Sequence, residues 1–338
     1  MSVDRARLSG ERLGAVRSLL DRHGRVGAML SARRNVAWLT AGGESHVVLS
    51  SETGVASLLV TGGGAVCLTQ NIEADRIAEE ELSGLGIETV AVPWWEPGAL
   101  EAEAVRRAGS ELAGDHDLEA DLVPLRSVLA PLDHERMVAL GGIGRDAVEG
   151  ALAAVEPGTT EADLAAELVS RLHGVRAPVV LVAADDRIVR YRHPLPKRTP
   201  IRRRVMLVLV VERWGLHVAL TRFRELEPPT ADLARRIDAV GEVERAMHEA
   251  TLAGATLGDV FAAARTGYAA AGVPDEWRDH HQGGMIAWQG RERIATPGDP
   301  TLIEAGMAFA WNPSIAGAKA EDTFVLEPDG TRRLVTAP

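Results

Sequence analysis

A change in the pattern of elements near residue 130 constrains the fold more than any other feature of the sequence. Before it, short apolar runs separated by Gly, Ser or Thr alternate with helical patterns, which is typical of an α/β domain of about 125 residues. After it, long amphipathic helices are interleaved with apolar strands. This favours an α+β domain, with helices packed on one side of a mainly antiparallel sheet. The sequence therefore predicts two domains, residues 1–129 and 130–338.

In the first domain we expect a helix over residues 9–24, with Ser9 as the N-cap and Gly24 as the stop. A second helix is expected over 71–86. The boundary segment, residues 121–137, contains two prolines and has no clear periodicity, so it is either a linker or the entry into a helix after Pro131. The apolar runs predict strands at residues 26–31, 45–51, 56–61, 64–70 and 87–92.

In the second domain, long helical patterns alternate with strand patterns. Its helical patterns cover residues 133–155, 159–174, 229–254 and 256–272, the second with a Thr N-cap and Glu161 in the first turn. Its strand patterns cover residues 177–184, 204–213, 216–223, 285–292, 305–314 and 320–330.

Composition excludes several classes of protein. The formal net charge of −11 argues against a nucleic-acid binder, which needs a clustered excess of Lys and Arg. The longest apolar run, VMLVLVV, is far too short to cross a bilayer. Cys67 is the only cysteine, so an intrachain disulfide and a Cys-rich zinc site are both excluded. The N-terminal segment lacks the apolar region of a secretory signal, and we therefore expect a cytoplasmic protein.

Six motifs occur in a characteristic order: EPGTTEADLAAEL, RHPLP, LHVALTRF, HHQGG, GMAFAWNP and EDTFVL. In this order they resemble the pita-bread (M24) family, which includes creatinase, Xaa-Pro aminopeptidases, prolidases and methionine aminopeptidases. The resemblance covers roughly Asp133 to the C-terminus. It extends more weakly to the first domain through ARRNVAWLTAGG. It implies a pita-bread second domain preceded by a smaller creatinase-type α/β domain.

The metal-dependent members of that family hold two metal ions with two Asp, one His and two Glu. At the matching positions this chain has Val208 and Ala219 for the two Asp and Asn312 for the first Glu, and it keeps only His281 and Glu321. Two ligands cannot hold a dinuclear site, so we expect no metal and no cofactor. A rebuilt site that uses Glu212 and His217, on either side of the turn RWG, is the remaining alternative.

Creatinase is similar and works without metal. The resemblance implies that His193 is the general acid and base, that His281 lines the pocket, and that Arg291 of GRE binds a substrate carboxylate. The Arg291 assignment assumes a deletion of one residue. Asn312 stands where creatinase has Glu, so creatine itself is not the expected substrate. Histidine is also the side chain best suited to proton transfer near pH 7.

The remaining candidates lie beside these motifs. Glu321 is expected to accept a substrate amine or to anchor His281, and His280 to line the pocket or orient its neighbour. Gly283 and Gly284 allow backbone or ligand to approach closely. The other candidate substrate-binding residues are Asn312, which could bind an amide or carbonyl oxygen, and Arg222, Trp277 and Trp288; with Trp311, the last two form either an apolar wall for substrate or plain core.

These expectations combine into a metal-independent hydrolase or lyase. It would cleave a C–N or other C–heteroatom bond in a small amino-acid-like or amidine-like substrate, and the composition suggests specialised metabolism in a high-GC bacterium. The alternatives are a non-catalytic protein that binds a peptide or small ligand, and a metallo-aminopeptidase or dipeptidase with a rebuilt site. The expected partners are a small-molecule substrate and a second copy in a homodimer, with no nucleic acid or membrane. By resemblance, residues near Arg33, Arg34 or His46 would reach the other subunit's pocket.

Overall fold

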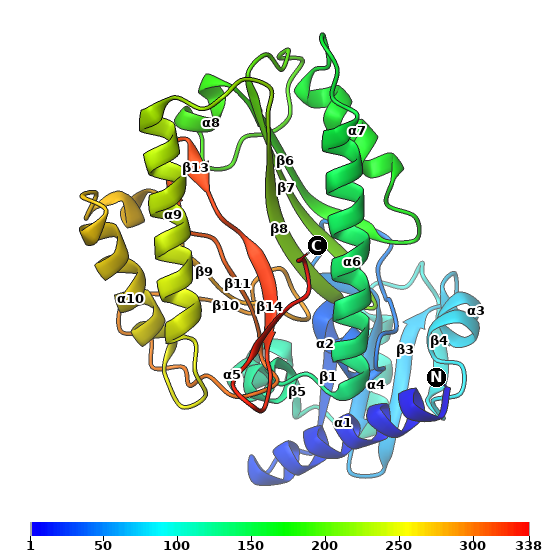
Figure 1. Ribbon diagram of the computed structural model, residues 1–338. Coiled ribbons are helices and arrows are strands. Elements are labelled where there is room, and N and C mark those ends of the chain that lie inside the picture. Colours follow the sequence, from blue (N-terminus) through cyan, green and yellow to red (C-terminus); the bar gives the residue numbers. More distant parts are fainter. Residues whose placement is uncertain (1, 338) are drawn as a thin grey trace. The chain divides into compact units, whose positions relative to one another are not determined.

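The computed structural model describes residues 2–337 and divides into two compact units (Figure 1). The first unit runs to Arg126 and includes Trp214–Leu216. The second comprises Ser127–Arg213 and the chain from His217 onward. Within residues 2–337 no helix has both the length and the apolar character needed to cross a membrane.

The first unit is built on a mixed five-stranded sheet in the order β4-β3-β2-β1-β5. The central strands pair antiparallel, and β4 and β5 add in parallel at the two edges. Buried aliphatic side chains on β2 and β3 form its core. The elements are α1 (Ser2–Arg22), β1 (Gly27–Ala32), α2 (Arg33–Leu39), β2 (Thr53–Thr61), β3 (Gly64–Gln70), α3 (Ala74–Arg76), the π-helix η1 (Ile77–Glu81), β4 (Glu88–Val92), α4 (Ala99–Ala108), β5 (Leu112–Gly114) and α5 (Asp115–Ser127).

Three local predictions for the first unit were wrong. Residues 45–51 form turns and bends rather than a strand, and three apolar side chains there are exposed. The first helix begins at Ser2, and Ser9 is not its cap: its buried hydroxyl donates to the carbonyl of Leu39 at 2.7 Å. The helix expected over 71–86 is limited to α3 and η1.

The boundary segment is not a flexible linker. Helix α5 continues through Pro124 to Ser127, because a proline in a helix interior removes a single hydrogen bond and packing can compensate for that loss. Helix α6 (Pro131–Ala153) then begins at Pro131, as one of the two alternatives predicted, with Pro in the first turn where its missing N–H is not needed.

The second unit has the predicted α+β architecture. It contains the antiparallel strands β6-β7-β8, a second sheet in the order β10-β9-β11-β14-β15, and a small hairpin of β12 and β13. Its other elements are α7 (Glu161–Ser170), β6 (Arg176–Ala184), α8 (Asp186–Arg190), β7 (Arg204–Arg213), β8 (Leu216–Glu225), α9 (Ala231–Ala250), α10 (Leu257–Ala270), the 3₁₀ helix η2 (Glu276–Asp279), β9 (Gly283–Met285), β10 (Arg293–Ile294), β11 (Ala308–Trp311), β12 (Ser314–Ile315), β13 (Ala318–Lys319), β14 (Asp322–Leu326) and β15 (Arg332–Leu334).

Helices cover the two sheets of this unit. Helix α6 packs on β7 and α7 on β6, while α9 and α10 pack together and against the second sheet (Figure 1). The sheets meet where Thr221 N on β8 donates to the carbonyl of Glu321 at 3.0 Å. The strand expected over 285–292 is wrong beyond Met285, because residues 287–290 form bends before the chain returns as β10.

Two adjacent glycines on α6 predict opposite effects of the same substitution. A Cβ on Gly141 would lie 2.1 Å from the carbonyl oxygen of Val335, whereas a Cβ on Gly142 would meet nothing within 4 Å. We expect Gly141→Ala to lower the free energy of unfolding by at least about 1 kcal/mol through overpacking. Gly142→Ala should raise it by about 0.5–1 kcal/mol, because Ala favours the helix. Urea unfolding followed by circular dichroism tests this, and shifts of the same sign would contradict it.

Candidate functional site

Three histidines from distant parts of the chain converge in the second unit. His193 lies in the loop after α8, and His280 and His281 follow η2. His280 Nε2 is 3.1 Å from His193 Nε2, and one ring nitrogen from each of the three residues lies within 4.8 Å of the others. The ring centroids are 4.7–5.7 Å apart. The sequence prediction that these residues share a site is consistent with this arrangement.

The backbone that carries His280 and His281 is fixed by the residues that follow. The buried amide of Gln282 donates to the carbonyl of His280 at 2.6 Å and accepts from the hydroxyl of Tyr268 at 2.7 Å. Gly283 and Gly284 have positive φ, and a Cβ on either would lie within 2.1 Å of a carbonyl oxygen of a paired strand. The glycines therefore allow backbone to approach backbone, which is one of the two roles predicted for them.

The loop that carries His193 is tied down on the C-terminal side of this residue. Val182 N on β6 donates to the carbonyl of Pro194 at 3.2 Å, and Lys197 N donates to the buried carboxylate of Glu161 at 2.9 Å. His280 is oriented from the opposite direction, because its Nδ1 is 3.0 Å from Ser314 Oγ. The contact with Ser314 leaves Nε2 of His280 facing Nε2 of His193.

A group of charged residues lies beside the histidines, centred on the buried carboxylate of Glu321. Its Oε1 accepts from Arg291 Nη2 at 2.7 Å, and its Oε2 accepts from Lys319 Nζ and from Thr221 Oγ1, both at 2.7 Å. Burial alone would raise the pKa of Glu321, but Lys319 and Arg291 together lower it to about 2. Burial lowers the pKa of Lys319, and the adjacent carboxylate opposes this change.

The same burial keeps the histidines neutral. It lowers the pKa of His280 to about 2 and that of His281 to about 4, and the positive charges of Lys319 and Arg291 add to the effect. The pKa of His193 is also lowered, first by burial and then by Lys319. At neutral pH each ring therefore has a lone pair that can accept a proton or bind a metal ion.

Asn312 and Arg291, both predicted to bind substrate, lie close to Glu321. Trp311 pairs with Asp322 across β11 and β14, which places Asn312 opposite Glu321. The side-chain oxygen of Asn312 is buried and accepts no hydrogen bond, and Nε of Arg291 is a buried donor that also has no partner. Arg222 is engaged elsewhere, with Asp322 at 2.7 Å.

Trp288 and Trp311 are buried, whereas the guanidinium groups of Arg265 and Arg278 lie over the ring of Trp277, 5.4 and 4.9 Å from its centroid. Trp311 is fully buried between strands and helices, where its indole N–H donates to Thr251 Oγ1 at 3.0 Å. Trp277 packs on the same hydrophobic core, against Phe261, and Trp288 is 2% exposed. These positions account for the side chains as core residues, and a role for Trp277 and Trp288 in substrate binding stays a prediction.

The residues present do not fit the dinuclear metal centre of the metal-dependent relatives. Val208 and Ala219 are buried and offer no ligand atom. Both oxygens of Glu321 already accept hydrogen bonds, one from Arg291 and the other from Lys319. Glu212 and His217 do not rebuild the centre either: their side chains are 3.9 Å apart, and His193, His280 and His281 form the only cluster of metal-binding type among residues 2–337.

Lys319 is the functional residue that sequence reasoning missed. Its signal was the spacing in AKAED, where residues 319 and 321 alternate along an extended segment and so face the same side. Ser314 and Thr221 were also missed. Their hydroxyl groups matter only through partners far away in sequence, and no local pattern reveals that.

Similar proteins are dipeptidases and prolidases. A probable dipeptidase PepE from Mycobacterium bovis is 28% identical over 195 residues, which cover 54% of this chain and 51% of that protein, so the chain spans about half the length of this curated relative. The crystal structure of dipeptidase PepE from Mycobacterium ulcerans covers 98% of this chain and 96% of its own, with a TM-score of 0.77 and 20% identity. The crystal structure of the prolidase from Pyrococcus horikoshii covers 97% of this chain and 98% of its own, with a TM-score of 0.80 and 17% identity.

The charged group predicts how stability depends on pH. Glu321→Gln leaves Lys319 and Arg291 buried without a carboxylate, which should cost about 3–5 kcal/mol at neutral pH. The pKa of Glu321 falls from 4.5 to about 2 on folding, so the wild-type protein keeps this stabilisation above pH 4.5 and loses it as the pH falls toward 2. The stability difference between the two proteins should therefore shrink on acidification. Urea unfolding from neutral pH to about pH 3, with exposed Glu304→Gln as control, measures it; a difference independent of pH would contradict the assignment.

The comparisons confirm the pita-bread fold and correct the predicted function. A metal-independent creatinase-like enzyme was the wrong expectation, because the curated relatives and the similar structures named above are dipeptidases and prolidases. The model of metallopeptidase family M24 matches residues 135–328, more than half of the chain and the whole region that holds the histidine cluster and Glu321. The chain belongs to metallopeptidase family M24.

Proposed function

We propose that the protein is a peptidase that hydrolyses a short peptide beside the histidine cluster. The observation that carries the proposal is the convergence of His193, His280, His281 and Glu321 on one partly buried site, all within the segment that matches family M24. Curated relatives that match 54% of the chain are named probable dipeptidases, which supports a short peptide as the substrate. In the reaction, water adds to the peptide carbonyl carbon, the C–N bond breaks, and the departing amine takes up a proton.

Unsatisfied polar atoms in the site suit a peptide unit. Arg291 Nε is a buried donor and Asn312 Oδ1 a buried acceptor, and neither has a partner in the protein. A peptide bond presents one carbonyl acceptor and one N–H donor, so a single peptide unit could satisfy both. An unsatisfied buried polar group costs about 1–3 kcal/mol, and substrate binding would recover part of this cost.

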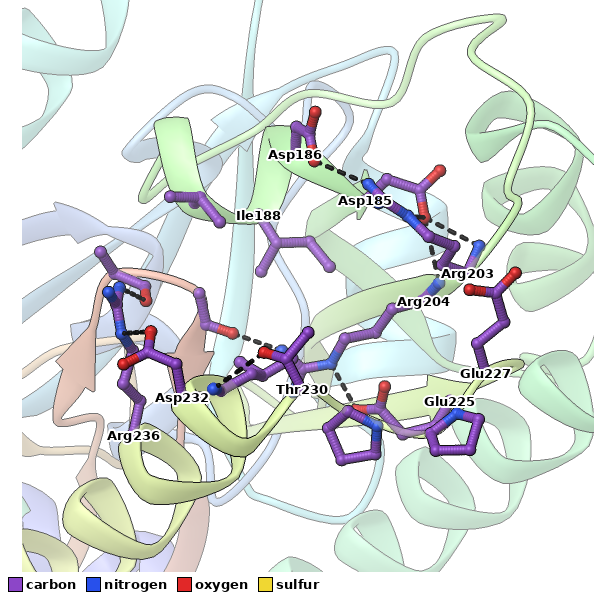
Figure 2. A pocket seen from close by; sticks show the side chains of 16 residues that line it. Asp185, Asp186, Ile188, Arg203, Arg204, Glu225, Glu227, Thr230, Asp232 and Arg236 are labelled. Atoms are coloured by element: carbon purple, nitrogen blue, oxygen red, sulfur yellow. Dashed lines mark hydrogen bonds and ion pairs between the residues drawn. The ribbon is translucent and has the colours of Figure 1, made fainter.

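A cavity of about 400 Å³, large enough for a dipeptide, lies in the second unit, although none of the three histidines, Arg291 or Glu321 lines it (Figure 2). It shares Ile188 with a cavity of only about 10 Å³ that is lined by His280 and Lys319, so side chains would have to move for a peptide in the larger cavity to reach the histidines. Charges of both signs line it, including Asp186 paired with Arg203 at 2.7 Å and Asp232 paired with Arg236 at 3.0 Å. A short free peptide has an ammonium group at one end and a carboxylate at the other, and both could find partners here.

The charged group gives each neighbouring residue a definite task. Lys319 and Thr221 hold Glu321, and Glu321 in turn fixes the Arg291 guanidinium, whose Nη1 donates to the carbonyl of Gly290 and whose Nε is left for substrate. The neutral rings of His193 and His281 can accept a proton from the attacking water and return it to the leaving amine.

A dipeptide panel that includes Xaa-Pro substrates tests the proposal. The full-length protein should release both amino acids, measured by mass spectrometry, and in ¹⁸O-labelled water one labelled oxygen should enter the new carboxylate. Arg291→Lys removes the Nε donor and should lower kcat/KM by about 10–100-fold. Arg245→Lys, on the exposed face of α9, is the matched control. Absence of hydrolysis across the panel would overturn the proposal.

The second candidate is a peptide-binding protein without catalysis. It is favoured by the saturation of Glu321, whose two oxygens are already bonded to Lys319, Arg291 and Thr221. Calorimetric titration with the same dipeptides separates the two candidates, since binding without ¹⁸O incorporation would support this one. The predicted homodimer, the small-molecule substrate and the cytoplasmic location are kept as part of the proposal.

A further inference from the structure

We propose that His193, His280 and His281 bind one divalent transition-metal ion of the Zn²⁺ class. This is a different ligand set from the carboxylate-rich one of the family's metal-dependent members, with which it shares only His281. Binding of the ion is inferred from geometry, whereas its use in peptide hydrolysis rests on the proposed function. Imidazole nitrogen is a preferred ligand for Zn²⁺, Co²⁺ and Ni²⁺.

The distances suit such an ion. Zn–N bonds of about 2.0–2.1 Å in a tetrahedral site place ligand nitrogens roughly 3.4 Å apart. His193 Nε2 and His280 Nε2 are already 3.1 Å apart, and all three ligand atoms lie within 4.8 Å. Small side-chain rotations close the difference, and His193, the most exposed of the three, has room to make them.

The hydrogen bonds leave lone pairs in the right places. His280 Nδ1 lies 3.0 Å from Ser314 Oγ, so when Nδ1–H donates to the hydroxyl, Nε2 is unprotonated and faces His193. Two Nε2 atoms at 3.1 Å can coexist only if a proton or a cation lies between them, and a metal ion replaces that proton. Gly283 N–H donates to His281 Nδ1 at 3.3 Å, so binding a metal ion through either nitrogen of this ring gives up that long hydrogen bond.

The nearby charges favour an anionic ligand at the fourth coordination position of the metal ion. Lys319, Arg291 and Glu321 together carry a net charge of +1, and three neutral imidazoles add none. A divalent ion here would therefore be under-neutralised. An anionic fourth ligand, such as hydroxide or the carboxylate of a peptide, reduces the excess charge. Three His ligands with an open position are the arrangement found in catalytic rather than structural zinc sites.

Titration of the full-length, chelator-treated protein with Co²⁺ and with Zn²⁺ tests the inference without reference to activity. Co²⁺ should bind with a stoichiometry of one and give the strong visible absorption of a tetrahedral site, and Zn²⁺ should displace it. His193→Gln should weaken Co²⁺ binding at least tenfold, and Ser314→Ala about tenfold by releasing His280. His173→Gln, which changes an exposed histidine outside the cluster, should leave it unchanged. The melting temperature of each variant without metal shows that it is folded.

The outcomes separate this inference from the proposed function. Binding of one Co²⁺ that depends on His193, with no peptide hydrolysis, would support the metal site and refute the peptidase. Hydrolysis that survives chelation, in a protein that shows no Co²⁺ absorption and binds no Zn²⁺, would refute the metal site and keep the peptidase. Equal Co²⁺ affinity of the wild type and the His193→Gln variant would also refute the site.

Discussion

The carboxylate of Glu321 organises the polar interior of the second unit. A negative charge at this depth is tolerated because Lys319, Arg291 and Thr221 supply three donors at 2.7 Å. In turn, this carboxylate makes it possible to bury Lys319, and it fixes Arg291 beside the histidines. The charges of this group also help to keep the imidazoles neutral, so the chemistry open to the cluster depends on it.

In the dinuclear relatives described above, two cations are held by carboxylates. Here the two cations that bind the retained carboxylate are side chains of the protein. Lys319 and Arg291 contact the two oxygens of Glu321, and the side chains of Val208 and Ala219 are buried and apolar. Two side-chain cations therefore compensate the buried negative charge of Glu321. This accounts for the burial of an ionised carboxylate at position 321.

Much of the fold could be predicted from the sequence, because the strands β6, β7 and β8 and the helices α7, α9 and α10 have strong periodicity and clear N-caps such as Thr160 and Thr256. Failures occurred where tertiary contacts override local signals. Residues 45–51 are as apolar as a strand but remain exposed, and α5 tolerates Pro124. In the site, motif order was enough to group His193, His281, Arg291 and Glu321. Lys319 and Ser314 could not be found in this way, because their roles come from side-chain contacts that no motif includes.

Gly283 and Gly284 have a consequence for how such a site can change over evolutionary time. Sheet pairing requires them, since any side chain at either position would collide with the backbone of the neighbouring strand. The segment that carries His280 and His281 is consequently held in place by the sheet and not by whatever the histidines bind. Ligands could then be exchanged one at a time while the chain stays folded at every intermediate. A scaffold of this kind lets a lineage replace the chemistry of its active site gradually and keep the same architecture.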